Sequence, residues 1–381
     1  MRVIADRLEG VVSAVPSKSE AHRAFICAAL ADKHTHIECR GGSDDIDATV
    51  ACLSALGAVI RRDQAGYDVN PINRAESGET VSLSCGESGS TFRFLLPIVG
   101  ALGRNASFVL KGRLPERPLS PLYEELARHG CELSPQGSNP FYAAGQLVPG
   151  NYLLDGGVSS QFISGLLFAL PLLDEDSKLR LEGNLESLPY IELTVKMLET
   201  FGINTAFDGG AFSIMGGQGY LSPGVVRIDG DWSNAAFWLG AGAIGEGRIT
   251  CTGLDMKSRQ GDRAIVEILS HFGARIECSD GAVSVSGGQL RGVEIDARDI
   301  PDLVPILAVI GAAAEGDTII RNAGRLRTKE SDRLAAMAEL LRRLGADANE
   351  TEDGLVLHGG AVLKGGTVSS CGDHRIAMAA A

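Results

Sequence analysis

The sequence predicts an α/β protein of two lobes, each built from three repeated units, and three observations support this class. The chain has 381 residues, of which 44% are hydrophobic and 22% charged, a globular composition in a chain too long for one compact core. A helix-like run followed by a glycine turn and an alternating strand returns five times. Short polar segments typical of helix starts return six times at nearly the same spacing.

The recurring turn has a glycine directly after each helix-like run. Successive glycines are 73, 72, 71 and 72 residues apart, and they are Gly57, Gly130, Gly202, Gly273 and Gly345. A glycine in this place tolerates the positive φ that a helix C-cap requires, so any one of them alone indicates only a cap. Five at constant spacing indicate a repeated unit of about 72 residues.

The helix starts give a second measure of the repeat. They lie 69 to 73 residues apart, at Lys18, Ser90, Ser160, Ser233, Asp302 and His374. Between the two marks each unit has room for a second helix and short alternating strands such as residues 282–286, so a unit reads strand, helix, strand, helix, strands. Six starts but five turns predict that the sixth unit is incomplete in this chain.

Composition excludes several classes of protein. With 35 Lys+Arg against 48 Asp+Glu the net charge is −13, which argues against a nucleic-acid partner. Eight cysteines without a C-x-x-C pair, and a start without an apolar signal core, predict a reducing, cytoplasmic location. The longest apolar stretch, residues 303–314, is interrupted by Pro305 and Gly311, so no membrane span is expected.

Six helix starts in two lobes predict surfaces that attract anions. If the helices of a lobe begin at the same face, their free N–H groups and dipoles favour negative ligands. At the first start Ser17 and Glu20 fit a capping box, with Lys18 and Arg23 beside it. This segment fits a ligand site and a plain surface helix about equally well.

Two further starts have the chemistry of a ligand site. Gly89 permits a close approach to the backbone, and Arg93 can form a bidentate pair with a carboxylate or phosphate. Ser159, Ser160 and Gln161 present two hydroxyls and an amide, which suit a polyhydroxyl ring. Ordinary Gly-Ser turns and serine N-caps explain the same patterns.

The last two starts hold the densest charges. Glu330 and Asp332 stand among four cations, which are Arg325, Arg327, Lys329 and Arg333. The segment fits either a solvated helix start or carboxylates that take part in proton transfer. Asp302 fits either an N-cap or a partly desolvated general base. His374 fits a buried histidine and Arg375 a surface charge, and no His or Cys cluster has metal-ligand spacing.

Taken together, these segments resemble the EPSP synthase (3-phosphoshikimate 1-carboxyvinyltransferase) family over essentially the whole chain. The motifs in family order are PSKSEAHR, GESGSTFR, LPERPL, DGGVSSQF, SLPYIELT, DIPDLVP, RTKESDR and DHRIAMA. The resemblance implies two lobes of three βαβαββ units, each an inside-out α/β barrel. One lobe would comprise residues 1–14 and 229–381, the other residues 15–228, with the active site in the cleft between them.

The resemblance also implies an activity. Family members transfer the enolpyruvyl group of phosphoenolpyruvate (PEP) to the 5-hydroxyl of shikimate 3-phosphate, releasing phosphate, on the route to chorismate and the aromatic amino acids. By similarity, shikimate 3-phosphate contacts Lys18, Ser19, Arg23, Ser159, Ser160, Gln161, Ser187, Asp302 and Lys329. PEP contacts Lys18, Gly89, Arg117, Gln161, Arg333 and Arg375. No cofactor or metal is implied, and a monomer is expected.

The same resemblance assigns the catalytic roles. Asp302 matches the family's base and Glu330 the acid, with Lys18 as a third catalytic group; guanidinium forks hold the two anions of the intermediate, with Arg93 and His374 as nearby support. Arg325 stands where some members have a shikimate-contacting Asn, so that contact is not carried over. A further PEP-binding Lys of the family lies beyond the printed residues.

Two other functions stay open at this point. The related transferase that uses UDP-N-acetylglucosamine typically has a reactive Cys in the loop corresponding to residues 111–119, and KGRLPERPL has none. A chain with an incomplete sixth unit also fits a ligand-binding form with little turnover.

Overall fold

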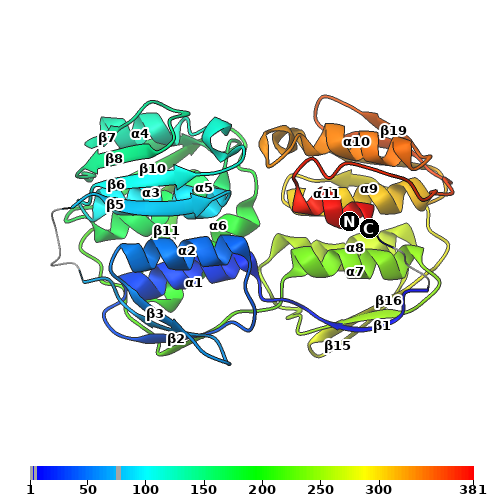
Figure 1. Cartoon of the computed structure of the whole chain (residues 1–381), viewed down its shortest axis with the longest axis horizontal. Helices are drawn as coiled ribbons and strands as arrows, with labels where there is room; N and C mark the ends of the chain where they lie inside the picture. Colours follow the sequence, from blue (N-terminus) through cyan, green and yellow to red (C-terminus); the bar gives the residue numbers. More distant parts are fainter. Residues whose placement is uncertain (1–2, 4–6, 74–78) are drawn as a thin grey trace. The chain divides into compact units, whose positions relative to one another are not determined.

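The computed structural model describes residue 3, residues 7–73 and residues 79–381 (Figure 1). The chain divides into two compact units. Unit 1 comprises Met1–Val15 and Asp229–Ala381, and unit 2 comprises Pro16–Ile228. Each unit has a hydrophobic core of its own.

Unit 2 contains three four-stranded sheets, each with helices packed against it. In order across each sheet, the strands are β13 (Val225–Arg227), β2 (Thr35–Glu38), β4 (Tyr67–Asn70) and β3 (Val59–Arg62); β5 (Val81–Gly86), β6 (Ala106–Leu110), β8 (Phe141–Gly145) and β7 (Cys131–Leu133); and β9 (Asn151–Asp155), β10 (Ser177–Glu182), β12 (Ala211–Ile214) and β11 (Thr205–Phe207). The helices are α1 (Lys18–Leu30), α2 (Asp44–Ala55), α3 (Gly89–Ala101), α4 (Leu122–Arg128), α5 (Ser160–Ala169), α6 (Leu188–Thr200) and the short η1 (Leu114–Glu116) and η2 (Leu170–Leu172).

Unit 1 contains two such sheets within the described residues. Their strands are β1 (Gly10–Ser13), β14 (Ile249–Thr252), β16 (Ala282–Ser286) and β15 (Arg275–Ser279); and β17 (Glu294–Asp296), β18 (Asp317–Arg321), β20 (Leu355–His358) and β19 (Asp347–Glu350). The helices are α7 (Trp232–Ile244), α8 (Ile265–Phe272), α9 (Val304–Ala313), α10 (Arg333–Arg343), α11 (His374–Ala380) and the short η3 (Gly261–Ala264), η4 (Pro301–Leu303) and η5 (Gly324–Thr328).

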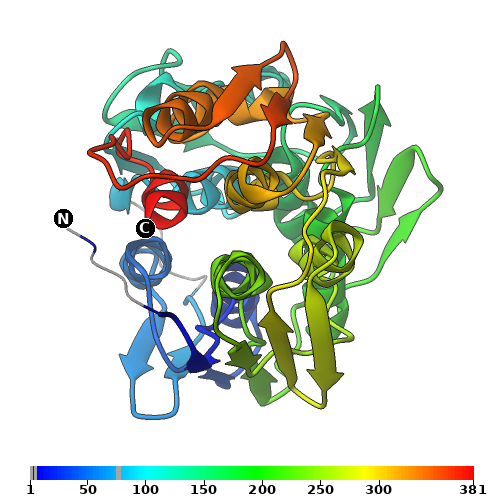
Figure 2. The ribbon, with the colours of Figure 1, turned by 90° about the vertical axis from the view of Figure 1, so that its right-hand side faces the viewer.

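All five sheets follow one plan. Two parallel strands lie side by side, and a hairpin extends the sheet antiparallel to the second of them. The first helix of a repeat is almost entirely buried, as in α3 and α9, because its sequence is apolar on all sides. Figure 2 views α7, α9 and α11 nearly end-on, with the strands of unit 1 outside them. The α/β repeat plan is as predicted.

The first sheet of each unit takes a strand from a distant part of the chain. β1 precedes α1 in sequence, yet it pairs in parallel with β14 of unit 1. β13, more than 180 residues after β2, pairs in parallel with β2 and completes the first sheet of unit 2. The chain therefore passes between the units twice, after β1 and after β13.

The glycine turns predicted from the spacing are confirmed. All five glycines have positive φ, between 76° and 107°, and each follows the second helix of its repeat; they are Gly57, Gly130, Gly202, Gly273 and Gly345. This left-handed conformation ends the helix at almost no steric cost for glycine. Within the described residues, no helix is long and apolar enough to cross a membrane.

Candidate active site

The N-terminus of α1 brings two of the expected cations into unit 2. Ser17 caps the helix, and its hydroxyl accepts from the N–H of Glu20 at 3.4 Å, as the predicted capping box requires. Lys18 Nζ lies 2.8 Å from Asp45 Oδ2 at the start of α2, and both side chains are partly exposed. Arg23 is 3% exposed, so the two cations have different surroundings.

Arg23 ties α1 to α6. Its guanidinium donates to the carbonyls of Ser19 and Tyr190, at 2.6 and 2.8 Å, and to the Thr194 hydroxyl at 2.8 Å. Burial lowers the pKa of Arg23 to about 10, which still leaves it charged at neutral pH. Arg23 is thus a buried cation whose guanidinium donates to three neutral oxygens.

The starts of α3 and α5 meet through an arginine–glutamine contact. Arg93 donates to Gln161 Oε1 at 2.7 Å and to the Pro118 carbonyl at 3.0 Å. Gln161 in turn donates to Ser90 Oγ at 3.0 Å. A Cβ on Gly89 would lie 3.0 Å from a terminal nitrogen of Arg117 and 3.3 Å from one of Arg93. The structure therefore brings Gly89, Arg93, Arg117 and Gln161 together.

The expected hydroxyl ligands lie at two helix starts. Ser159 caps α5 and accepts from the N–H of Gln161 at 3.3 Å, so the N-cap alternative applies to it, and Ser160 is the first residue of the helix. Ser187 precedes α6 with φ 56° and ψ 36°. A serine in this left-handed conformation is strained, and such strain is typical of functional positions.

A buried chain of polar side chains connects α1, α2 and α3. His22 Nδ1 lies 2.7 Å from Thr49 Oγ1, which lies 2.6 Å from Thr91 Oγ1, which donates to Ser88 Oγ at 2.8 Å. Burial lowers the pKa of His22 to about 3, so this imidazole is neutral at neutral pH. The chain ends at Ser88, the N-cap of α3 directly before Gly89.

In unit 1, Arg333 at the start of α10 joins three acids. Its guanidinium lies 2.9 Å from Asp302 Oδ1, 2.9 Å from Glu330 Oε2 and 2.8 Å from Asp373 Oδ2. Burial opposes its charge, but the three carboxylates outweigh burial and raise the pKa of Arg333. The base and the acid expected from the sequence are thus bridged by one fixed cation.

Arg375 holds the other oxygen of Asp302. Its guanidinium lies 2.8 Å from Asp302 Oδ2, while its backbone N–H donates to Asp373 Oδ1 at 2.9 Å. Neither η4 nor α9 has a side-chain cap, so the N-cap alternative for Asp302 is wrong. Arg375 is only 6% exposed, so the surface-charge alternative is wrong as well.

Asp262, on η3, is a buried acid that the sequence did not single out. Burial first, and then the charge of Asp302, raise the pKa of Asp262 to about 7, while Arg375 opposes this rise. Asp262 is thus electrostatically part of the Asp302 group and is largely protonated below neutral pH.

Three further residues named from the sequence are His374, Lys329 and Arg325. His374 begins α11 with its side chain exposed, so the buried alternative is wrong. Lys329 follows η5, one residue before Glu330, and is partly exposed. Arg325 donates to the carbonyl of Arg298, in the segment that leads to Asp302.

The structure divides the charge cluster predicted around Glu330 and Asp332. Asp332 caps α10 and pairs at 3.0 Å with Arg327, which also pairs with Glu350. Of the two acids in this cluster, Glu330 is the one whose side chain pairs with Arg333. Asp332 therefore belongs to the helix cap, whereas Glu330 belongs to the Asp302 group.

Sequence reasoning missed partners that are distant in the chain. Asp45 and Asp373 each stand next to a helix start and pair with a predicted site cation. Asp373 was visible in the DHRIAMA motif, where Asp at an N-cap is common, but its pairing with Arg333, 40 residues earlier, has no local signal.

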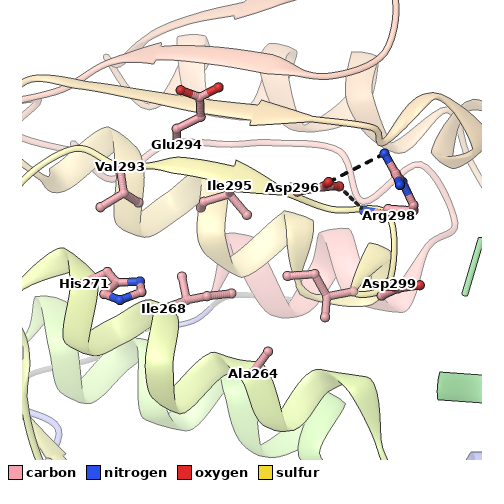
Figure 3. Close-up of a pocket in the computed structure, with 10 residues that line it drawn as sticks. Ala264, Ile268, His271, Val293, Glu294, Ile295, Asp296, Arg298 and Asp299 are labelled. Carbon is pink, nitrogen blue, oxygen red and sulfur yellow. Dashed lines mark hydrogen bonds and ion pairs between the residues drawn. The ribbon is translucent and has the colours of Figure 1, made fainter. Parts of the chain in front are cut away.

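A surface pocket of about 390 Å³ lies near the Asp302 segment (Figure 3). Its lining includes the apolar Ile268 of α8 and Ile295 of β17 and the charged Asp296 and Arg298. It contains none of the predicted site residues, but its lining ends at Ile300, two residues before Asp302.

The chain is similar to known proteins over nearly its whole length. The chain matches the family described as EPSP synthase (3-phosphoshikimate 1-carboxyvinyltransferase) over residues 3–381. A 3-phosphoshikimate 1-carboxyvinyltransferase of Clostridium kluyveri is 44% identical over 379 residues, covering 98% of this chain and 88% of the relative. One from Clostridium perfringens is 42% identical over 382 residues, covering 100% of this chain and 90% of the relative.

Solved structures agree on the fold. An EPSP synthase from Acinetobacter baumannii superposes with a TM-score of 0.80 at 24% identity, covering 98% of this chain and 88% of that one. The fold and the matches define an enzyme of the carboxyvinyltransferase class. The chain belongs to the EPSP synthase family, and its activity is enolpyruvyl transfer in the shikimate pathway.

Proposed function

We propose that this chain transfers the enolpyruvyl group of PEP to the 5-hydroxyl of shikimate 3-phosphate with Asp302 as base and Glu330 as acid. The observation that carries the assignment is the position of Arg333, whose guanidinium lies 2.9 Å from an oxygen of each carboxylate. A base and an acid fixed to one cation keep a defined separation, as a reaction with two proton transfers requires.

In the first step Asp302 takes the proton of the 5-hydroxyl as its oxygen attacks C2 of PEP. Glu330 gives a proton to C3, which becomes a methyl group in the tetrahedral intermediate. In the second step a methyl proton and the phosphate leave, which yields the enolpyruvyl ether and inorganic phosphate. The two carboxyl groups exchange roles between the steps, so each ends the cycle in its starting protonation state.

Cations in both units serve the anions of the substrates. In unit 2, Arg93 has the neutral partners Gln161 and the Pro118 carbonyl, and Arg117 lies against Gly89, which supports PEP binding at the start of α3. Planar guanidinium groups suit the carboxylate and phosphate that share one carbon in the intermediate. In unit 1, Arg333 and Arg375 have the same chemistry beside Asp302.

The hydroxyls and Lys18 support shikimate 3-phosphate binding. Ser159 and Ser160 stand at the N-terminus of α5, where free N–H groups and the helix dipole favour a phosphate. Lys18 at the start of α1 adds a partly exposed cation. Lys329 and Ser187 are assigned to the same ligand on the family motifs, and the strained backbone of Ser187 supports its role.

The base assignment is tested by Asp302→Asn. The amide keeps the shape and can still accept from one arginine but cannot take a proton, so kcat should fall by roughly 100-fold or more while shikimate 3-phosphate binding stays within about tenfold. Phosphate release measures kcat, and calorimetry measures binding. Asp332→Asn is the matched control, because Asp332 caps α10 and Asn caps equally well. Turnover near wild type in Asp302→Asn would contradict the assignment.

The acceptor substrate is tested in the same assay. Phosphate release with shikimate 3-phosphate and none with UDP-N-acetylglucosamine is expected, in line with the absence of Cys from residues 111–119. Binding of both substrates without phosphate release would support the ligand-binding alternative.

We also propose a cytoplasmic monomer without a cofactor. All eight cysteines are free thiols, which suits a reducing compartment. Two compact units with separate hydrophobic cores support a chain that folds without a partner. Light scattering on the purified protein at several concentrations measures its mass directly.

A further inference from the structure

A cluster of histidine and aspartate side chains lies on the first sheet of unit 2, apart from every residue discussed above. His36 Nδ1 and His34 Nε2 each lie 2.9 Å from the same oxygen of Asp68, Oδ1. One possible ligand atom from each of His36, Asp63 and Asp68 lies within 4.8 Å of the others. One imidazole and two carboxylates therefore lie close together on this sheet, and the second imidazole, that of His34, joins them through Asp68.

Strand geometry brings these side chains to one face. The neighbours of His36 in β2 and those of Asp68 in β4 are buried, so His36 and Asp68 face outward in the alternating pattern of a strand. They are direct partners in the antiparallel register of β2 and β4. His34 stands two residues before His36 and therefore shares its face.

The turn between β3 and β4 holds Asp63 beside them. Asp63 Oδ1 accepts from the N–H groups of Ala65 and Gly66, both at 2.7 Å, which orients the carboxylate. A Cβ on Gly66 would lie 1.9 Å from the carbonyl oxygen of Ile37. Only glycine lets the turn pack this closely against β2, so the position of Asp63 next to His36 is built into the backbone.

We propose that His34, His36, Asp63 and Asp68 bind a divalent metal ion of the zinc class, which links β2, β4 and the β3–β4 turn. Imidazole nitrogen and carboxylate oxygen are preferred ligands of such ions. A tetrahedral site with bonds of about 2.0–2.2 Å needs ligand atoms about 3.4 Å apart. The ligand atoms of His36, Asp63 and Asp68 already lie within 4.8 Å of one another, so a metal ion would draw them together by an ångström or so.

The positive charge of an arginine on the neighbouring strand opposes a cation. Arg61 of β3 is the direct partner of Asp68 in the β3–β4 register, so its guanidinium belongs to the same region of the sheet. Two carboxylates outweigh this single positive charge. Removing it by Arg61→Ala should therefore tighten metal binding, whereas a cluster that does not bind metal would show no such effect.

Unit 1 offers a matched control pair. His358 Nδ1 lies 2.9 Å from Asp317 Oδ1, and the two residues are direct partners in β18 and β20, the equivalent strands of another repeat. This pair has the same hydrogen bond and exposed surroundings but supplies one imidazole only. His358→Ala is therefore expected to leave metal binding unchanged.

The test is calorimetric titration of the full chain with zinc chloride, followed by cobalt(II) absorption spectra. The background carries Cys278→Ser and Cys371→Ser, because these two exposed thiols would also bind zinc. We expect one ion per chain with Kd on the order of 1 μM, and the intense visible bands of tetrahedral cobalt(II). At a hundredfold excess over Kd, zinc should raise the Tm by about 5 °C.

The variants decide the assignment. His36→Ala and Asp68→Asn should each weaken zinc binding at least about thirtyfold, His34→Ala about tenfold, and Arg61→Ala should strengthen it, with circular dichroism as the check on folding. His36 and Asp68 are half-buried and His34 is exposed, and none of the three belongs to the hydrophobic core, so each substitution leaves the core intact. Wild-type binding weaker than about 100 μM, or a Kd that His36→Ala changes by less than threefold, would overturn the proposal.

Discussion

The two units use different residues where a side chain caps the first helix of a repeat. In unit 2 the caps are the neutral hydroxyls of Ser17, Ser88 and Ser159. In unit 1, α7 and α11 are capped by the carboxylates of Asp231 and Asp373. Serine and aspartate cap a helix about equally well, so helix stability alone does not explain why the two units differ.

The buried arginines of the two units also have different partners. Arg23 and Arg93 of unit 2 donate to carbonyl, hydroxyl and amide oxygens. Arg333 and Arg375 of unit 1 bind carboxylates. The arginines of unit 2 thus have neutral oxygens among their partners, although Lys18 pairs with Asp45, whereas those of unit 1 are fixed to the carboxyl group of Asp302, which is proposed to transfer a proton.

The largest expected effect separates the ion pairs of the two units. Arg333→Met should lower the free energy of unfolding by roughly 3–5 kcal/mol, because it leaves buried acids without their cation. Lys18→Met should cost less than about 1 kcal/mol, because its pair with Asp45 is partly exposed. Denaturant unfolding measures both. Equal losses of unfolding free energy in the two variants would contradict the prediction. If Arg333→Met does not fold, Arg333→Lys replaces it in the comparison.

The second test uses pH, because the pKa of buried Asp262 in unit 1 is raised whereas the pKa of buried His22 in unit 2 is lowered. Between pH 4.5 and 6, native Asp262 holds a proton that the unfolded chain has lost, so its contribution to stability falls as pH rises towards 7. Native His22 lacks a proton that the unfolded chain has gained, so its contribution falls as pH drops from 6.5 towards 3.

Neutral substitutes should therefore change the pH slope of stability in opposite directions. In this window Asp262→Asn should make the slope more positive, and His22→Asn more negative, each by about 1.4 kcal/mol per pH unit. Urea unfolding at four pH values measures the slopes. If either variant changes the free energy of unfolding by the same amount at every pH, the assigned protonation state of that residue is contradicted.

The smallest expected effect converts one cap to the chemistry of the other unit. Ser159→Asp keeps a good N-cap, so stability should change by less than about 0.5 kcal/mol. The added negative charge at the start of α5 should raise the KM for shikimate 3-phosphate roughly tenfold. Ser159→Asn, which caps without charge, is the control. An unchanged KM in Ser159→Asp would mean that this helix start does not meet the phosphate.

The repeat plan was predictable because its marks are local. The positive φ of Gly57 or Gly345 and the serine caps follow from a few neighbouring residues. Pairings across long distances in the chain left no such marks. The sequence did not predict Asp373 as the partner of Arg333, Asp262 near Asp302, or the approach of Asp63 to His36, because packing of separate elements decides each of them.

The exchange of β1 and β13 has a consequence for synthesis on the ribosome. β1 is made first, but its partner β14 ends at Thr252, so at 5–20 residues per second this strand stays unpaired for roughly 10 to 50 s. Unit 2 gains its last strand, β13, before β14 is made. The unit whose sequence is continuous can therefore fold during translation, while the first strand of the other stays unpaired and accessible to chaperones.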